Sequence, residues 1–388
     1  MPYAWGSRSA LASLRGQDEP SAEPQAELWM GAHPLAPSRL APAHGGRSLQ
    51  QIIEEAPGPH LGERVLERFG PRLPFLMKVL AADAPLSLQA HPSLAQARGG
   101  FEREQRAGIP ITAPHRRYKD PNHKPELLCA LEPFEALSGF RDHPEAHEVL
   151  AALGVPHLEP VLALLRSSNA PLRSAFEALM RLADGHRLPL VDAVGRAARA
   201  RAEEGGPHAR AYHWAATLAE IYPGDAGVVS SLLLRHVELS AGEAIYLPAG
   251  NLHAYLRGVG VEIMASSDNV LRGGLTTKHV DVEELLAVLD FETVGPSLVK
   301  AEPVREGVWA YKTSAPDFEL STLEIAGEVH VAEVDAAEIV FCARGEVVLT
   351  GTSSLTLRSG ESAFVPANAS AYRAHGNGTL FRATPGRD

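Results

Sequence analysis

Two kinds of hydrophobic spacing divide the chain into β-rich and helical segments. Residues 73–91 read LPFLMKVLAADAPLSLQAH, in which two apolar runs flank the turn-like AADAP, a pattern that predicts a β-hairpin. Side chains alternate across a strand, so Ser87, Gln89 and His91 are expected on one face and their apolar neighbours on the other. Three polar groups on one face indicate the polar interior of a barrel.

Residues 141–222 change to helical spacing. Leu172, Phe176 and Leu179 recur at helical intervals behind Pro171, which suits a first helical turn. Glycines follow RSAFEALMRLAD and DAVGRAARARAEE, where left-handed caps would end two helices. We therefore predict a helical insertion between β segments.

A turn motif stands at residues 242–253, which read GEAIYLPAGNLH. Gly242 opens a tight turn, a short strand follows, and Pro248 and Gly250 bend the chain where backbone donors are not needed. His253 then starts the next strand. This spacing delivers a histidine onto a strand inside a small β-barrel.

The C-terminal part repeats this motif. In SGESAFVPANASAY, Gly360 stands for Gly242 and Pro366 for Pro248, and the surrounding sequence is β-rich and punctuated by glycine. At the position of the histidine the repeat carries Ala371, which cannot bind a metal. The chain is thus expected to hold two copies of one β fold, of which only the first keeps a metal.

These patterns predict a mainly β protein with a helical insertion. At 388 residues the chain is long for one hydrophobic core, since such cores stop growing near roughly 250 to 300 residues. We expect two small jelly-roll barrels, the second degenerate, and an α-helical domain. The expected boundaries are 1–140 with 223–296 for the metal-binding catalytic domain, 141–222 for the helical insertion, and 297–388 for the C-terminal domain.

Charge and cysteine content exclude several classes of function. A net charge of −11 argues against nucleic acid or an anionic membrane as a partner, because those surfaces select a basic protein face. No run of 18 apolar residues is present, and the only cysteines, Cys129 and Cys342, are far apart. We expect a cytoplasmic protein without a disulfide framework.

Four side chains form a candidate metal centre: Gln89, His91, Glu126 and His253. Two imidazoles with a carboxylate and an amide suit Zn²⁺, Fe²⁺ or Mn²⁺. One zinc ion per chain is the first choice, because catalytic zinc keeps an open coordination position and no redox-cofactor motif accompanies the site.

Each of these candidates also has a structural alternative. The chain has 17 histidines, most of which must be solvated, and Gln89 could be an ordinary polar strand residue. Glu126 could form only a surface ion pair with Lys124, worth at most ~1 kcal/mol.

A dense polar segment, VGVEIMASSDNVLRGGLTTKH, is a candidate substrate loop. Its residues 262–278 hold Glu262, Asp268, Arg272 and Lys278 beside two glycines. The planar fork of Arg272 can address an oxyanion or phosphate with paired hydrogen bonds. The alternative is a turn with solvated charges.

Five blocks of the sequence resemble the type I mannose-6-phosphate isomerases. They are WMGAHPLAPS, LSLQAHP, DPNHKPELLCAL, YLPAGNLHAY and DNVLRGGLTTKHVD, in family order from residue 29 to 281. The resemblance implies a zinc-dependent bicupin enzyme that interconverts mannose 6-phosphate and fructose 6-phosphate. It implies Gln89, His91, Glu126 and His253 as metal ligands, Arg272 as the active-site arginine, and Lys124 as the lysine beside the ligand glutamate.

Aldose–ketose isomerisation moves a proton between C1 and C2 through an enediolate. We expect Arg272 and Lys124 to stabilise the negative charge that develops beside the metal. Asp268 or Glu262 is the favoured proton carrier, with His123 and metal-bound water as alternatives. Both carboxylates could instead only support the metal ligands or pair with cations.

Phosphate recognition is expected at Ser87 together with a cation, for which Lys78, Lys278 and Arg272 are the candidates. Lys78 is unusual because it stands within an apolar run. A buried lysine needs an anionic partner, which could be the substrate phosphate or an internal carboxylate.

Two other functions remain open from the sequence. One is a different metal-dependent cupin, either an oxygenase or another sugar-phosphate isomerase, and the other is a non-catalytic sugar-binding bicupin. For the favoured function, the expected partner is a small sugar phosphate, and the protein is expected to act as a monomer.

Overall fold

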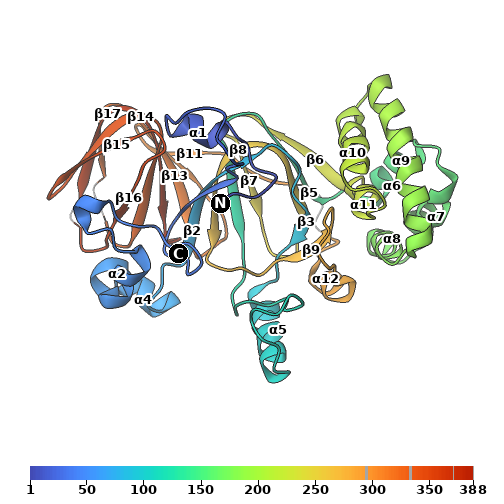
Figure 1. The fold of residues 1–388 in the computed structure, drawn as a ribbon, viewed down its shortest axis with the longest axis horizontal. Helices are drawn as coiled ribbons and strands as arrows, with labels where there is room; N and C mark the ends of the chain where they lie inside the picture. The colour runs from blue at the N-terminus through green and yellow to red at the C-terminus, as the bar shows by residue number, and fades with distance from the viewer. Residues whose placement is uncertain (293–295, 332–333, 370, 388) are drawn as a thin grey trace.

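The computed structural model describes residues 1–292, 296–331, 334–369 and 371–387. Figure 1 shows a central β domain with helices on one side and a second β domain on the other. The predicted fold class, mainly β with a helical insertion and two β domains, is confirmed. Within the described residues, no helix is both long and apolar enough to cross a membrane.

The central domain is built from a ten-stranded antiparallel sheet that folds back on itself. Its main path runs β1-β2-β8-β4-β7-β10, while β3 and β5 both pair with β8, β9 pairs with β3, and β6 pairs with β5. The strands are β1 (Glu27–Met30), β2 (Phe75–Ala82), β3 (Leu88–Ala90), β4 (Glu126–Ala130), β5 (Phe134–Phe140), β6 (Leu234–Leu239), β7 (Ala244–Leu247), β8 (His253–Ala265), β9 (Leu271–Gly274) and β10 (Ser297–Val299).

Strand β8 pairs with four other strands of this barrel. Its first residues pair with β3 and β5, and its later residues pair with β2 and β4. β8 changes partners at Gly258. The φ of this residue is +127°, a value that glycine adopts readily and other residues rarely do, and a Cβ atom there would lie 2.7 Å from the Phe134 ring. His253 at the start of β8 and Glu262 near its end are therefore held by different partner strands of one barrel.

The predicted hairpin of β2 and β3 is wrong. Both edges of β2 are occupied, one by β1 and the other by β8, so no edge is left for β3. β3 instead pairs with β8 and β9. The turn-like AADAP segment therefore carries the chain across the barrel, which a local pattern of apolar runs could not show.

The helical insertion is present as α6 (His143–Ala151), α7 (Glu159–Ser167), α8 (Pro171–Met180), α9 (Asp184–Glu204), α10 (Ala209–Ile221) and α11 (Gly227–Ser231). Gly205, with φ +81°, ends α9 as predicted. Gly185 does not cap a helix, because α8 already ends at Met180 and Gly185 lies in the first turn of α9. The remaining α-helices are α1 (Ala10–Leu14), α2 (Leu49–Glu55), α3 (Pro57–Leu61), α4 (Glu63–Phe69), α5 (Leu94–Arg106) and α12 (Val282–Val288).

The C-terminal domain is a seven-stranded sheet in the order β11-β12-β13-β17-β14-β15, with β16 also paired to β14. Its strands are β11 (Glu302–Arg305), β12 (Val308–Tyr311), β13 (Glu319–Val331), β14 (Glu338–Thr350), β15 (Ser354–Arg358), β16 (Ser362–Val365) and β17 (Tyr372–Thr384). β10 lies just beyond the expected boundary at residue 296 and still pairs with β7 of the central domain.

The strand register relates the two β domains residue by residue. In the first, Glu126 lies opposite Leu247, and two positions later Leu128 lies opposite Glu262. In the second, Glu338 lies opposite Val365, which precedes Pro366 as Leu247 precedes Pro248. The second barrel thus keeps a glutamate at the position of the predicted ligand Glu126.

At the position of Glu262 the second barrel has an arginine. Two residues after Glu338, Val340 lies opposite Arg382, as Leu128 lies opposite Glu262. The Arg382 guanidinium pairs with the Glu338 carboxylate at 2.5 Å, and the Tyr372 hydroxyl donates to the same carboxylate at 3.0 Å. A fixed side-chain cation therefore neutralises the buried carboxylate where the first barrel is expected to use a metal.

This pairing predicts a stability effect. Arg382→Met should destabilise the protein by roughly 3 to 5 kcal/mol, because it leaves Glu338 buried without its cation. The double variant Glu338→Gln/Arg382→Met should be more stable than the single variant. Calorimetric unfolding would measure both, with Arg373→Met at an exposed position of β17 as the control. A single variant as stable as the double one would contradict this role for Arg382.

Candidate metal centre

The two predicted histidine ligands and the glutamate converge in the first barrel. His91 follows β3, Glu126 begins β4 and His253 begins β8, and all three are at most 1% exposed. Their ligand atoms lie within 4.8 Å of one another. The Nε2 atoms of both histidines are 3.4 Å from Glu126 Oε2. Tetrahedral ligands of a zinc ion, bound at about 2.0 to 2.1 Å, would stand at about this spacing.

The hydrogen bonding around these atoms fits a metal. Nε2 of His91, Nε2 of His253 and Oε2 of Glu126 are buried and have no hydrogen-bond partner among the described residues. The opposite ring nitrogens are engaged: Nδ1 of His91 lies 2.8 Å from the Asn269 carbonyl, and Nδ1 of His253 lies 3.1 Å from the Asn251 carbonyl. Donation from Nδ1 leaves the Nε2 lone pair aimed at the shared centre, as in metal-bound histidines.

The fourth predicted ligand, Gln89, is placed beside these three by strand register. It lies opposite His253 in the β3–β8 pair and opposite Arg272 in the β3–β9 pair. Directly opposed residues of an antiparallel pair point to the same face. The half-buried Gln89 amide thus shares a face with His253, and its role as a ligand stays a prediction.

The charges around Glu126 keep its carboxylate ionised, as a metal ligand must be. Lys124 Nζ lies 2.9 Å from Glu126 Oε1, and both side chains are buried, so this is not the surface ion pair that the sequence left open. Burial alone would raise the pKa of Glu126, but the Lys124 ammonium and the two histidines hold it well below its usual range. Burial lowers the pKa of His91 to about 4, so this imidazole is neutral, as a ligand must be.

A buried charged chain runs beside the metal centre. Lys78 Nζ lies 3.2 Å from Glu262 and 3.4 Å from Glu27, and the Tyr255 hydroxyl donates to Glu262 at 2.8 Å. Lys78 thus has the internal carboxylate partners that the sequence left open as an alternative. Burial and the neighbouring Glu126 raise the pKa of Glu262 despite the nearby Lys78.

Asp268, the other predicted proton carrier, has a different environment. Its side chain is 40% exposed and pairs with His33 Nε2 at 3.3 Å. Burial opposes ionisation, but the hydrogen bond and charge of His33, together with the charges of Lys124 and Lys78, lower the pKa of Asp268. His123, an alternative carrier, pairs at 2.7 Å with Asp317 of the C-terminal domain.

Arg272 and Lys278 form an uncompensated positive site. Neither makes an ion pair with a residue that the structure describes, and the Arg272 charge, with partial burial, lowers the pKa of Lys278. Ser87 adjoins Leu88, which lies opposite Gly274 on the strand that carries Arg272. Three of the four predicted phosphate contacts, Ser87, Arg272 and Lys278, thus lie on neighbouring segments.

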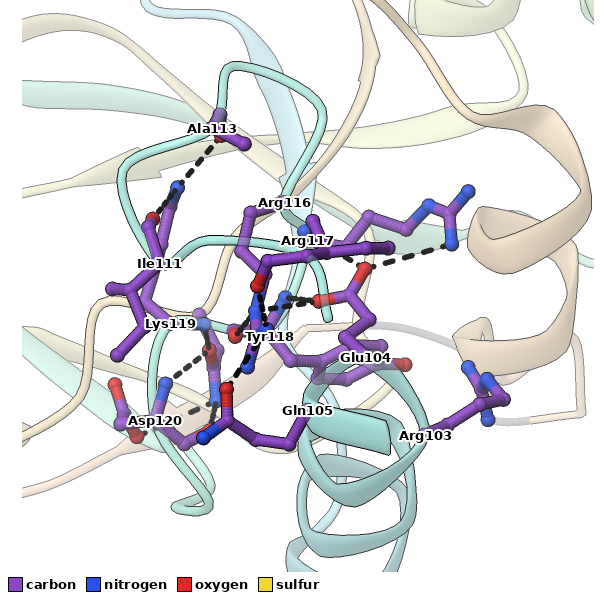
Figure 2. A network of polar contacts seen from close by, with 12 residues as sticks. Arg103, Glu104, Gln105, Ile111, Ala113, Arg116, Arg117, Tyr118, Lys119 and Asp120 are labelled. Atoms are coloured by element: carbon purple, nitrogen blue, oxygen red, sulfur yellow. Dashed lines mark hydrogen bonds and ion pairs between the residues drawn. The ribbon is translucent and has the colours of Figure 1, made fainter. Parts of the chain in front are cut away.

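The loop that leads to β4 is held by Glu104 of α5 (Figure 2). The Glu104 carboxylate is buried, pairs with Arg116 at 2.9 Å and accepts from the backbone N–H of Tyr118 at 3.0 Å. Further along the loop, Asn269 accepts from the Lys119 N–H at 2.7 Å and donates to the Asp120 carbonyl at 2.7 Å. Because the Asn269 carbonyl also orients His91, this loop supports the metal centre.

Sequence reasoning missed several supporting residues: Glu27, His33, Asn251 and Tyr255. Asn251 lies in the turn motif and His33 in the block WMGAHPLAPS, so the local signal was present. Tyr255 ends the block YLPAGNLHAY, so a local signal was present there too. Glu27 gave no signal, because its role depends on which strands are neighbours.

A second acidic cluster is already occupied by internal donors. Glu135, His236 and Glu238 are close enough for a metal. However, Glu135 accepts hydrogen bonds from Arg210, Trp214 and His236, which leaves it saturated. This cluster ties α10 to the sheet.

Comparison with known proteins agrees with this site. The family model described as phosphomannose isomerase type I, catalytic domain, matches residues 1–143, and that of the mannose-6-phosphate isomerase cupin domain matches residues 309–385. The mannose-6-phosphate isomerase of Escherichia coli (strain K12) is 41% identical over 98% of this chain and 96% of its own length. The human enzyme is 32% identical over 95% and 92%.

Solved structures agree as well. The mannose 6-phosphate isomerase of Salmonella typhimurium, bound to fructose 6-phosphate and zinc, superimposes with a TM-score of 0.90 at 39% identity, covering 100% of this chain and 97% of its own. Sequence and structure thus agree over nearly the whole length, and the chain belongs to the type I phosphomannose isomerase family.

Proposed function

We propose that this enzyme interconverts mannose 6-phosphate and fructose 6-phosphate at a single zinc centre held by Gln89, His91, Glu126 and His253. The observation that carries this proposal is a set of three buried ligand atoms that lie within 4.8 Å of one another and have no hydrogen-bond partner in the part of the chain that the structure describes. When bound, zinc supplies Lewis-acid polarisation of a neighbouring oxygen and a fixed positive charge.

The chain's own cations stabilise the enediolate. Lys124 lies beside the metal ligand Glu126, and Arg272 lies on the strand opposite Gln89. Both are partly or fully removed from water, where a fixed positive charge stabilises a developing oxyanion more strongly than it would in water.

Glu262 is the better candidate for carrying the proton between C1 and C2. It is buried, and its raised pKa brings it closer to neutrality, where a carboxylate takes up and returns a proton most effectively. It lies opposite Leu128, two positions along β4 from Glu126, and so faces the same side of the sheet. Asp268, half exposed and with a lowered pKa, is assigned to orienting His33 instead.

The substrate phosphate is assigned to Arg272, Lys278 and Ser87. Neither cation has an ion-pair partner among residues 1–292, 296–331, 334–369 and 371–387, and a dianion between them relieves their mutual repulsion. Lys78 is not included, because Glu27 and Glu262 already neutralise it.

We propose that the protein acts as a monomer, because His91, Glu126 and His253 converge within one barrel of the chain. We place the reaction in the cytoplasm, because Cys129 and Cys342 are both buried free thiols, as expected in a reducing compartment.

The metal assignment predicts that His253→Ala abolishes both zinc binding and turnover. Elemental analysis should give about one zinc per wild-type chain and almost none in the variant. Chelation should inactivate the wild type, and added zinc should restore a coupled fructose 6-phosphate assay. His186→Ala, at an exposed histidine of α9, is the control. Bound iron with oxygen consumption would favour an oxygenase and contradict the proposal.

The proton-carrier assignment predicts that Glu262→Gln lowers kcat by about 10² to 10⁴-fold, the usual range for loss of a general acid–base. Zinc content should stay unchanged, and release of a C2 isotope label to solvent should slow in parallel. Asp268→Asn is the comparison and should lose less. If Asp268→Asn instead stops label exchange and Glu262→Gln does not, the two roles are reversed.

The phosphate assignment predicts that Lys278→Met raises KM for mannose 6-phosphate about tenfold, the effect of losing roughly 1.4 kcal/mol of charge-assisted hydrogen bonding. Arg272→Met should raise KM and also lower kcat, since Arg272 serves both phosphate and enediolate. Lys312→Met, at an exposed lysine paired with Glu302, is the control. Full turnover by Arg272→Met would remove that residue from the site.

A further inference from the structure

The backbone after β9 takes an unusual course between Arg272 and Lys278. Gly274 has φ +117°, and Leu275 has φ +55°, the only positive φ of a non-glycine residue in the part of the chain that the structure describes. A leucine with left-handed backbone is strained and persists only where its surroundings hold it. Leu275 is 1% exposed and packs in the core shared with the helical insertion.

One carboxylate of the helical insertion holds this turn. Asp225 lies between α10 and α11, and its Oδ1 accepts from the Gly227 N–H at 2.7 Å. Its Oδ2 accepts from the Thr276 N–H at 3.1 Å, and the Thr276 hydroxyl accepts from the Lys278 N–H at 3.1 Å. A chain of hydrogen bonds thus runs from the insertion to the backbone of Lys278.

The backbone of the helical insertion touches the turn after β9 at Gly227 and Gly274, which brings Asp225 within hydrogen-bonding distance of Thr276. A Cβ on Gly227 would lie 2.7 Å from the Leu275 nitrogen, and one on Gly274 would lie 2.7 Å from the Gly227 Cα. Just before this contact, the Tyr222 hydroxyl donates to the Pro85 carbonyl at 3.3 Å, two residues before Ser87. The insertion therefore contacts both segments to which we assign the phosphate.

We propose that Asp225 is a positioning residue that fixes the Gly274–Lys278 turn so that Arg272 and Lys278 face the substrate phosphate together. This inference rests on the proposed phosphate site. Asp225 does not touch the substrate in this assignment, and it acts through the backbone of Thr276.

Because Asp225 is negatively charged, the direction in which phosphate binding changes shows whether Asp225 positions the site. A negative charge close to an anion site weakens anion binding, so its removal would by itself tighten the binding of phosphate. Loss of positioning has the opposite effect. Asp225→Asn should therefore raise both KM for mannose 6-phosphate and the inhibition constant of inorganic phosphate by about fivefold or more, and it should lower kcat less than Arg272→Met does.

The comparison variants separate this role from general destabilisation. Asp192→Asn removes an exposed carboxylate of α9, paired with Arg196 on the same helix, and should leave every constant unchanged. In a Lys278→Met background, Asp225→Asn should raise the phosphate inhibition constant less than in the wild type, since the group that it positions is already missing. Asp225→Glu, which keeps the charge but displaces it, should fall between the wild type and Asp225→Asn.

Two results would overturn the inference in distinguishable ways. If Arg272→Met and Lys278→Met leave phosphate inhibition unchanged, the phosphate assignment fails and the positioning role fails with it. If those variants weaken inhibition but Asp225→Asn leaves it unchanged or tightens it, the phosphate site stands and Asp225 does not position it.

Discussion

The burial of three unshared electron pairs in one barrel is the constraint on which the site depends. His91, Glu126 and His253 are removed from water, and their inward atoms have no donor in the described part of the chain. Such atoms cost several kcal/mol unless a cation binds them. Carbonyls of Asn269 and Asn251 engage the other ring nitrogens, which leaves the Nε2 lone pairs for that cation, and burial disfavours protonation of His91. The strand ends, the turn motif and the Glu104 network all serve to keep these three groups together.

Charge balance explains why a divalent ion also prepares the site for an anionic substrate. Beside the ligand Glu126, the interior holds the carboxylates of Glu27 and Glu262 and the ammonium groups of Lys78 and Lys124. Three carboxylates against two ammonium groups leave an excess negative charge, and a divalent ion reverses its sign. The second barrel balances its buried carboxylate differently, because the single charge of Arg382 matches that of Glu338.

The sequence predicted best where a local pattern determines the structure. The turn of residues 242–253 placed His253 at the start of a strand, because glycine and proline restrict the backbone there whatever lies around it. Strand partners could not be predicted in this way. The hairpin of β2 and β3 was wrong, and the partnership of Lys78 with Glu27 was invisible, because both depend on which distant strands are neighbours. Asp225 was missed because its acceptor role depends on contact between two distant backbones.

The two flanking domains explain how a small barrel can have so polar an interior. Gln89, His253 and Arg272 share one side of their strands. The residues that alternate with them point to the opposite side and join the core of the helical insertion: Leu88, Ala90, Ala254 and Leu271. Lys78, Glu126 and Glu262 face inward on the other strands. The residues that alternate with them face outward and share a core with phenylalanines of the C-terminal domain. These residues are Met77, Val79, Leu127, Val261 and Ile263, and the phenylalanines are Phe318, Phe341 and Phe381. An antiparallel sheet needs one apolar face packed against a partner. Because each flanking domain supplies that partner from outside, the inner faces are free to carry charged groups.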